Sequence, residues 1–81
     1  MREGDDVFAS VHATPANVLV NGTPTAWRLG LTVADVLRER GTDDEWVATA
    51  VNTRFVPRAA RLDTPLWPDD RLVVFSAVVG G

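Results

Sequence analysis

The sequence predicts a small α+β roll, in which a mixed sheet of four to five strands packs on one main helix. Three observations support this fold class. Two β-rich runs flank an Asn-Gly pair, one short helix with marked ends follows, and strand-like runs then return up to the last residues. A helix this short is not stable alone, so it must bury its apolar side against the sheet.

Turn chemistry predicts the first hairpin. Asn17-Val18-Leu19-Val20 is a short β-rich run, and the Asn21-Gly22 pair that follows is the strongest short-range signal for a hairpin. The returning strand is expected over 25–29. Thr23-Pro24 beside the turn is expected to lengthen the loop, because proline cannot donate to a strand ladder.

The helix is predicted from both of its ends. Thr32 suits the N-cap, and Asp35 three residues later completes a capping-box-like pair. Leu31 and Val36 fit a hydrophobic staple across the first turn. Gly41 suits the left-handed position that ends a helix.

Three further strands are predicted after the helix. They are expected over 46–51, over 54–56 before Pro57, and over 71–78. Residues 57–68 show no clear periodicity, and the apolar residues Leu62, Leu66 and Trp67 are expected to tuck this loop against the core. Pro68-Asp69-Asp70 reads as a turn rather than as an acid–base pair.

The last strand is apolar on both faces. Leu72 and Val74 would face one side, whereas Val73, Phe75 and Ala77 would face the other. One short helix can cover only one face of a sheet. The outer face is therefore expected to be a docking surface for another protein, the alternative being a central strand buried on both faces.

Composition excludes several classes of function. The net charge is −3, the eight basic residues are all Arg, and they are scattered among eleven acids, so a nucleic-acid partner is not expected. No apolar run approaches the roughly 20 residues that span a bilayer, and no signal core is seen, which predicts a cytoplasmic protein without a membrane partner. No Cys and one His (His12) argue against metal cages and His-based triads.

The expected organisation has three parts. Residues 1–16 are interpreted as a mobile N-terminal extension, with a short strand over 7–11 as the alternative, 17–79 as one folded domain, and 80–81 as a tail. Gly80 and Gly81 have no side chains and accept almost any backbone angle. They would let a peptide end enter a narrow channel and present its carboxylate to another active site.

Over residues 17–81 the sequence resembles the ubiquitin-like sulfur carriers, and most of all the branch that serves thiamine biosynthesis. The most specific part is Val51-Asn52 followed by Val56-Pro57-Arg58. The hairpin, the helix over 32–37, Asp70 and the tail over 77–81 also match. The family usually has Gly-Asp before the last strand, where this chain has Asp69-Asp70.

The resemblance implies a ubiquitin-like β-grasp fold and a co-substrate rather than an enzyme. A partner adenylating enzyme, similar to E1 enzymes, would use Mg-ATP to activate the carboxylate of Gly81. A cysteine desulfurase or another persulfide donor would supply sulfur to form a thiocarboxylate, and thiazole synthase would accept it. The chain itself would bind no cofactor or metal and would be a monomer on its own.

The candidate site residues follow from the tail and the last strand. Gly81 is the point of attachment and Gly80 precedes it. The partner-binding surface is predicted to comprise Val73, Phe75, Ala77, Val78 and Val79, with Arg58 and Arg71 either as charged rim contacts or as solvated surface residues. Trp27, Trp46 and Trp67 are interpreted as core or loop-covering residues rather than ligand stackers.

Three other functions stay open on the sequence. The chain could carry sulfur for molybdopterin, as the small subunit of molybdopterin synthase does, or for another cofactor or amino acid. It could be a ubiquitin-like protein modifier, although the absence of Lys prevents lysine-linked chains on itself. It could also be an interaction module whose tail is inert.

Overall fold

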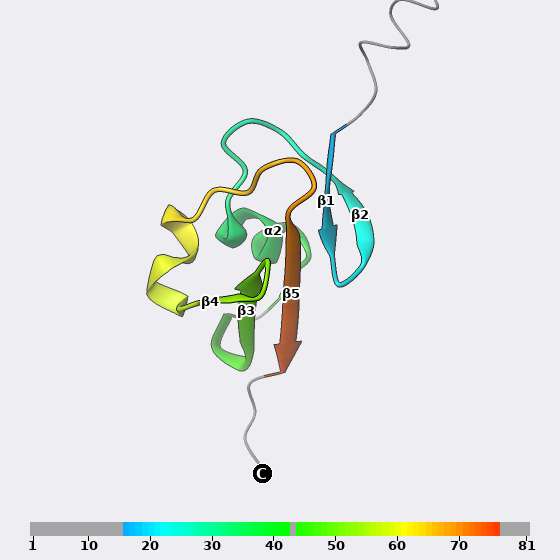
Figure 1. The fold of residues 1–81 in the computed structure, drawn as a ribbon. Coiled ribbons are helices and arrows are strands. Elements are labelled where there is room, and N and C mark those ends of the chain that lie inside the picture. Colours follow the sequence, from blue (N-terminus) through cyan, green and yellow to red (C-terminus); the bar gives the residue numbers. More distant parts are fainter. Residues whose placement is uncertain (1–15, 43, 77–81) are drawn as a thin grey trace, which may run out of the picture.

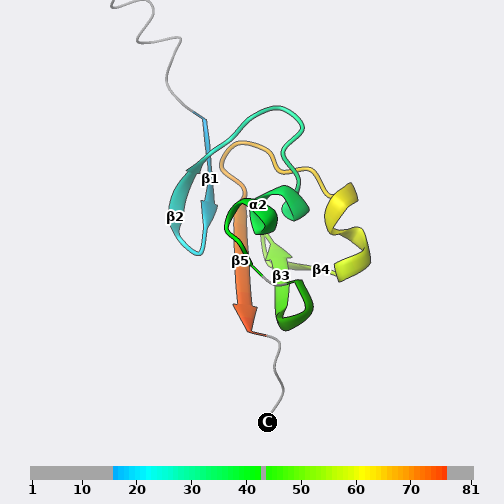
Figure 2. The same cartoon turned by 180° about the vertical axis from the view of Figure 1, so that it is seen from behind.

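The computed structural model of the chain describes residues 16–42 and 44–76, which form a five-stranded sheet with one α-helix on one face (Figures 1 and 2). The strand order is β2-β1-β5-β3-β4, in which β1 and β5 are parallel and the other pairs are antiparallel. The predicted α+β roll with a mixed sheet is therefore confirmed. The elements are β1 (Asn17–Val20), β2 (Thr23–Ala26), α2 (Val33–Glu39), β3 (Val47–Val51), β4 (Arg54–Val56) and β5 (Arg71–Ser76), with two 3-10 helices, η1 (Asp44–Trp46) and η2 (Arg58–Asp63).

The first hairpin forms at Asn21-Gly22, as predicted, but its second strand starts earlier than expected. Both turn residues have positive φ (51° and 82°), and Val20 pairs directly with Thr23. The prediction of a longer loop and a strand over 25–29 is therefore wrong. Pro24 fits into β2 because it lies opposite Leu19, whose N–H points away to the carbonyl of Asp70, so that no ladder bond is lost at this sheet edge.

Helix α2 has the predicted ends. The side chain of Thr32 accepts from the N–H of Asp35 at 3.1 Å, and the Asp35 carboxylate accepts from the N–H of Thr32 at 3.0 Å. The bond from the Thr32 N–H, together with one from the Arg38 side chain, lowers the pKa of the Asp35 carboxyl. At the other end Gly41 has φ 70°, and bonds from its N–H and that of Thr42 close a Schellman motif.

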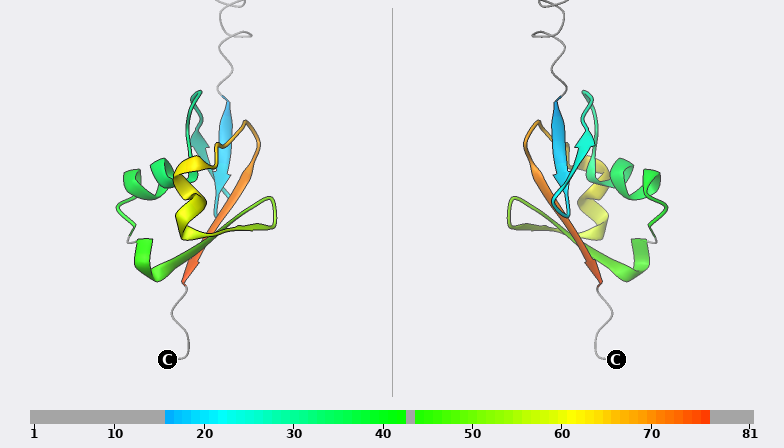
Figure 3. Two further views of the ribbon diagram at one scale, coloured as in Figure 1. Left: turned by 90° about the vertical axis from the view of Figure 1, so that its left-hand side faces the viewer. Right: turned by 90° about the vertical axis from the view of Figure 1, so that its right-hand side faces the viewer.

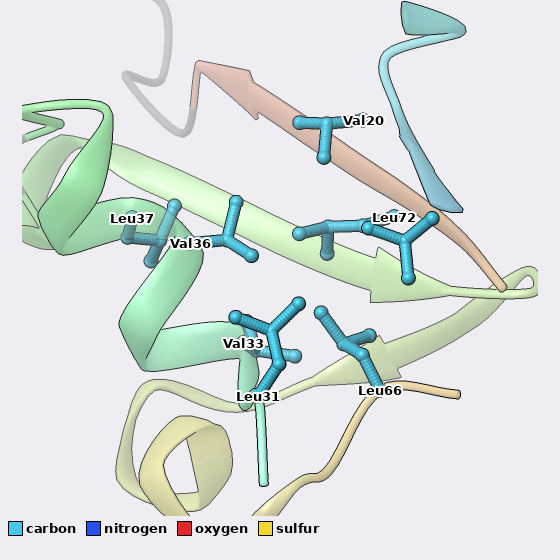
Figure 4. Close-up of a cluster of buried hydrophobic side chains, with 8 residues drawn as sticks. Val20, Leu31, Val33, Val36, Leu37, Leu66 and Leu72 are labelled. Carbon is cyan, nitrogen blue, oxygen red and sulfur yellow. The ribbon is translucent and has the colours of Figure 1, made fainter. Parts of the chain in front are cut away.

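The core lies between α2 and the inner face of the sheet (Figure 4). Its buried members are Val18, Val20, Leu31, Val33, Val36, Leu37, Leu66 and Leu72. Leu31 and Val36, the predicted staple, are both among them. Thr49 is the buried polar residue of β3, and its hydroxyl donates to the carbonyl of Val56 at 3.0 Å, which satisfies it within the sheet.

Segment 57–68 contains an element that the sequence did not reveal. Residues Arg58–Asp63 form η2, which packs against α2, and the buried Arg61 donates from Nη2 to the carbonyl of Val47 at 2.7 Å. Of the three residues expected to tuck inward, Leu66 is buried, whereas Leu62 is 66% exposed and Trp67 is 52% exposed. The expectation is therefore wrong for Leu62 and only partly met for Trp67, whose side chain is half-buried.

The tryptophans differ in burial. Trp27 is half-buried against the core, and its Nε1 donates to the carbonyl of Leu66 at 2.6 Å, which confirms it as a packing residue. Trp67 lies beside it with ring centroids 6.2 Å apart. Trp46 is 56% exposed at the end of η1, which places it outside the core, and whether it stacks on a ligand stays untested.

The turn before β5 forms as predicted. Asp69 has φ 73°, the left-handed conformation that a glycine would adopt most easily. The carboxylate of Asp70 accepts from the N–H of Trp67 at 2.8 Å and from Nδ2 of Asn52 at 2.9 Å. Asp70 is thus a structural acceptor that ties this turn to the β3–β4 turn.

Candidate docking face and tail

The outer face of the sheet, opposite α2, is left uncovered within the described part of the chain (Figure 3). Side chains alternate along β5, so that Leu72 and Val74 point inward while Val73 and Phe75 point outward. Residues that pair directly across strands share a face. The register therefore places Ala50 opposite Val73 and Ala48 opposite Phe75 on this outer face.

An apolar patch occupies the outer face. Three of its members are large and exposed: Phe55 at 65%, Phe75 at 48% and Val73 at 44%. Ala50 of β3 lies between Val73 of β5 and Phe55 of β4, because it pairs with both. We refer to Ala48, Ala50, Phe55, Val73 and Phe75 as the outer-face patch. Such a contiguous exposed apolar surface is typical of a protein-binding site.

The structure brings some of the predicted partner-binding residues together. Val73 and Phe75 lie in the outer-face patch, and Arg71 is exposed at the start of the same strand, next to Leu19 of β1. Arg58 is exposed at the start of η2, beyond β4, so that β3 and β4 separate it from Arg71 in the sheet order. The predicted rim role of both arginines stays a prediction.

The predicted tail residues lie outside the described residues. This applies to Ala77, Val78, Val79, Gly80 and Gly81. The structure does describe where the chain leaves the sheet, at the end of β5, the central strand (Figure 1). The outer-face patch extends along this strand as far as Phe75, six residues before Gly81.

Sequence reasoning missed Phe55 as a member of the candidate surface. The signal was present in the alternation of β4, because Val56 is buried and pairs with Thr49 while its neighbour Phe55 must point outward. In a strand of three residues this alternation is too brief to identify the outer face without knowing the partner strand.

Two asparagines in equivalent turns hold the edges of β5. Asn21 accepts from the N–H of Val74 through Oδ1 at 2.8 Å and donates from Nδ2 to the carbonyl of Val74 at 3.1 Å. On the other edge, Asn52 accepts from the N–H of Arg71 through Oδ1 at 2.9 Å. Both asparagines have positive φ, 51° and 50°, which asparagine tolerates better than most residues.

Over 16–42 and 44–76, no pocket is present and no three His, Cys, Asp or Glu side chains cluster as metal ligands would. None of the helices in this part of the chain is long and apolar enough to cross a bilayer.

The five-stranded mixed sheet with one helix on one face defines a β-grasp domain. The sequence matches the ThiS family over residues 14–81, and the chain belongs to that family. The solved structure of the thiamine biosynthesis protein ThiS from Geobacter metallireducens is similar, with a TM-score of 0.68 and 25% identity over 80% of this chain and 99% of that chain. A search of curated proteins gave no match.

These comparisons confirm the resemblance stated from the sequence. The match extends to residue 81, so it includes the predicted diglycine tail as well as the folded domain. It begins at residue 14, which leaves most of the predicted N-terminal extension outside the region shared with the family.

Proposed function

We propose that this chain is a cytoplasmic sulfur carrier in thiamine biosynthesis and that the carboxylate of Gly81 is its reacting group. The observation that carries the proposal is the family match through residue 81. The outer-face patch supports it, because a partner that binds there would contact Phe75, six residues before Gly81.

The proposed chemistry starts with activation. A carboxylate is a poor electrophile at neutral pH because it is anionic and resonance-stabilised. An adenylating partner, using Mg-ATP, converts it to an acyl-adenylate and releases pyrophosphate. A persulfide from a cysteine desulfurase or a similar donor then attacks the acyl carbon and displaces AMP, which gives an acyl disulfide. A second thiol attacks the donor's sulfur in this S–S bond, forms a disulfide with it and releases the thiocarboxylate.

In this scheme the chain is a co-substrate and not an enzyme. It contributes the reacting end and the surfaces that place it, which removes much of the entropic cost of bringing two reactants together. Thiazole synthase then takes the sulfur from the thiocarboxylate. The outer-face patch is proposed to bind the adenylating partner, with Arg71 at its margin and residues 77–79 continuing the contact toward that active site.

Intact-mass measurement tests the proposal directly. The full chain is incubated with Mg-ATP, the cognate adenylating enzyme, a persulfide donor and a thiol reductant. The expected product is heavier by the difference between sulfur and oxygen, and the increase is confined to the C-terminal peptide. A control chain that lacks Gly81 is expected to keep its mass. No increase in the full chain under conditions that convert another carrier of the family would refute the proposal.

A further inference from the structure

The side chain of Asn21 continues the sheet where the main chain of β1 cannot. The parallel pairing of β1 with β5 consists of the Leu19–Arg71 and Val20–Leu72 pairs, after which the chain turns away at Asn21. The Asn21 amide then makes both main-chain bonds of Val74, at 2.8 and 3.1 Å. We call these two bonds the Asn21 clamp.

The clamp acts close to the point at which the chain leaves the domain. On the β3 side, β5 is paired as far as Ser76, whereas main-chain pairing on the β1 side stops at Leu72. A strand that is paired on one edge only can twist about that edge. Through the clamp, β5 is hydrogen-bonded on both edges as far as Val74, two residues before the end of the strand.

Val74 is also the neighbour of two residues of the outer-face patch. Val73 and Phe75 flank it in sequence and point outward, while Val74 points inward toward the core. A restraint on Val74 therefore acts on two features at once: the orientation of the patch, and the end of β5 at Ser76, from which the chain continues toward Gly81. Reaction rates are sensitive to errors of about 1 Å in such placement.

We infer that Asn21 is a positioning residue for adenylation, because its clamp on Val74 sets the geometry between the docking patch and the reacting tail. This inference rests on the proposed function. Asn21 does not touch the reacting atoms. It acts through β5, and its loss weakens productive docking of the tail without changing the chemistry of the carboxylate.

Asn52 provides a matched control within the same molecule. It lies at the same position of an equivalent turn, with φ 50° against 51° for Asn21, and its amide also makes two bonds, at 2.9 Å to the N–H of Arg71 and 2.9 Å to Asp70. The difference is where each amide acts. Asn52 holds the first residue of β5 and Asn21 holds the fourth.

The test compares Asn21→Gly with Asn52→Gly in the full chain. Glycine keeps the positive φ and removes the amide in both variants. Pyrophosphate exchange with the cognate adenylating enzyme gives KM and kcat for the carrier, thermal unfolding gives the stability of each variant, and hydrogen exchange reports the Val74 amide. Asn21→Asp is a partial variant, because it keeps an acceptor for the Val74 N–H and loses the donor to the Val74 carbonyl.

For Asn21→Gly we expect kcat/KM to fall by about threefold to tenfold, with a lower kcat, and the Val74 amide to exchange faster. Asn52→Gly is expected to lower kcat/KM by no more than about twofold at a similar loss of stability, and Asn21→Asp is expected to be intermediate. Equal kcat/KM values for the two glycine variants would overturn the inference and leave the proposed function intact. Absence of pyrophosphate exchange by the wild-type chain would overturn the proposed function, and this inference with it.

Discussion

Replacing Phe55 by Ala tests whether the outer-face patch is the docking surface. Phe55 is 65% exposed, and a phenylalanine buries roughly 150–250 Å² when fully covered, so about 130 Å² is available to a partner. At about 25 cal/mol per Å², complete coverage would contribute at most about 3 kcal/mol. Because Phe55 lies at the margin of the patch and Ala keeps part of the contact, we expect a loss of about 1–2 kcal/mol.

This loss corresponds to a rise of about 5- to 30-fold in the KM of the adenylating enzyme for the carrier. The kcat is expected to change little, because the substitution removes binding and leaves the reacting end unaltered. Pyrophosphate exchange at several carrier concentrations measures both constants. Thermal unfolding of Phe55→Ala checks that the domain is intact, which we expect because most of the side chain is outside the core.

Leu62→Ala is the matched control. Leu62 is 66% exposed, almost the same as Phe55, but it belongs to η2, which packs against α2 and does not pair in the sheet. We expect its KM to equal that of the wild type. An unchanged KM for Phe55→Ala, or an equal rise for Leu62→Ala, would refute docking through the outer-face patch.

Thr53→Gly is expected to stabilise the domain by about 1 kcal/mol, because a β-branched residue at φ 73° is strained and an Asn-Gly turn is not; an unchanged unfolding midpoint would contradict this. Asp35→Asn keeps an acceptor for the N–H of Thr32 and removes the charge. Folding lowers the pKa of Asp35 from 3.8, so the ionised carboxylate stabilises the folded state above about pH 4. This stabilisation is lost as the pH falls through the pKa of Asp35 in the folded state. The denaturant unfolding curves of wild type and variant are therefore expected to converge in acid. Gly81→Ala is expected to fold normally and to be adenylated poorly, since a Cβ would clash in a channel built for bare backbone; wild-type pyrophosphate exchange would argue against such a channel. A chain extended by one residue, which moves the carboxylate by about 3.5 Å, is expected to be inactive in the same assay.

Local chemistry made the turns and the helix predictable. Asn21-Gly22 specifies a two-residue turn, and Thr32, Asp35 and Gly41 specify the helix ends through bonds to neighbours close in sequence. These features depend on a few adjacent residues and on nothing far away. The structure reproduces the turn at Asn21-Gly22 and both helix ends, whereas the longer loop expected from Thr23-Pro24 does not form.

Features that depend on distant partners were less predictable. Pro24 enters β2 only because β2 is an edge strand and the N–H of Leu19 serves Asp70, a fact of sheet order that the hairpin sequence does not contain. The η2 helix has an irregular pattern because its buried member is Arg61, which bonds to Val47 and reads as a surface residue in sequence. Its neighbour Leu62 is apolar but faces solvent, so the burial of these two residues is the reverse of what their side chains suggest.

The residues of the candidate site also differ in how far the sequence alone predicts them. Period-two alternation was enough to place Val73 and Phe75 outward on the last strand. Phe55 required the register of β4 with β3, and the Asn21 clamp required knowing that a turn at residue 21 lies beside Val74. The Asn21–Val74 contact joins residues 53 positions apart in the chain, whereas the β3–β4 pairing is local but involves a strand of only three residues.

The central position of β5 also governs when the protein can acquire its shape. Its neighbours are β1 on one edge and β3 on the other, so neither half of the sheet can join the other until residue 76 has left the ribosome. The sheet is therefore completed only after β5 is available, because β5 makes pairs that are distant in sequence with β1. A fragment that ends before β5 cannot form the five-stranded sheet, because β5 joins β1 to β3. We expect such a fragment to be more susceptible to proteolysis than the folded domain.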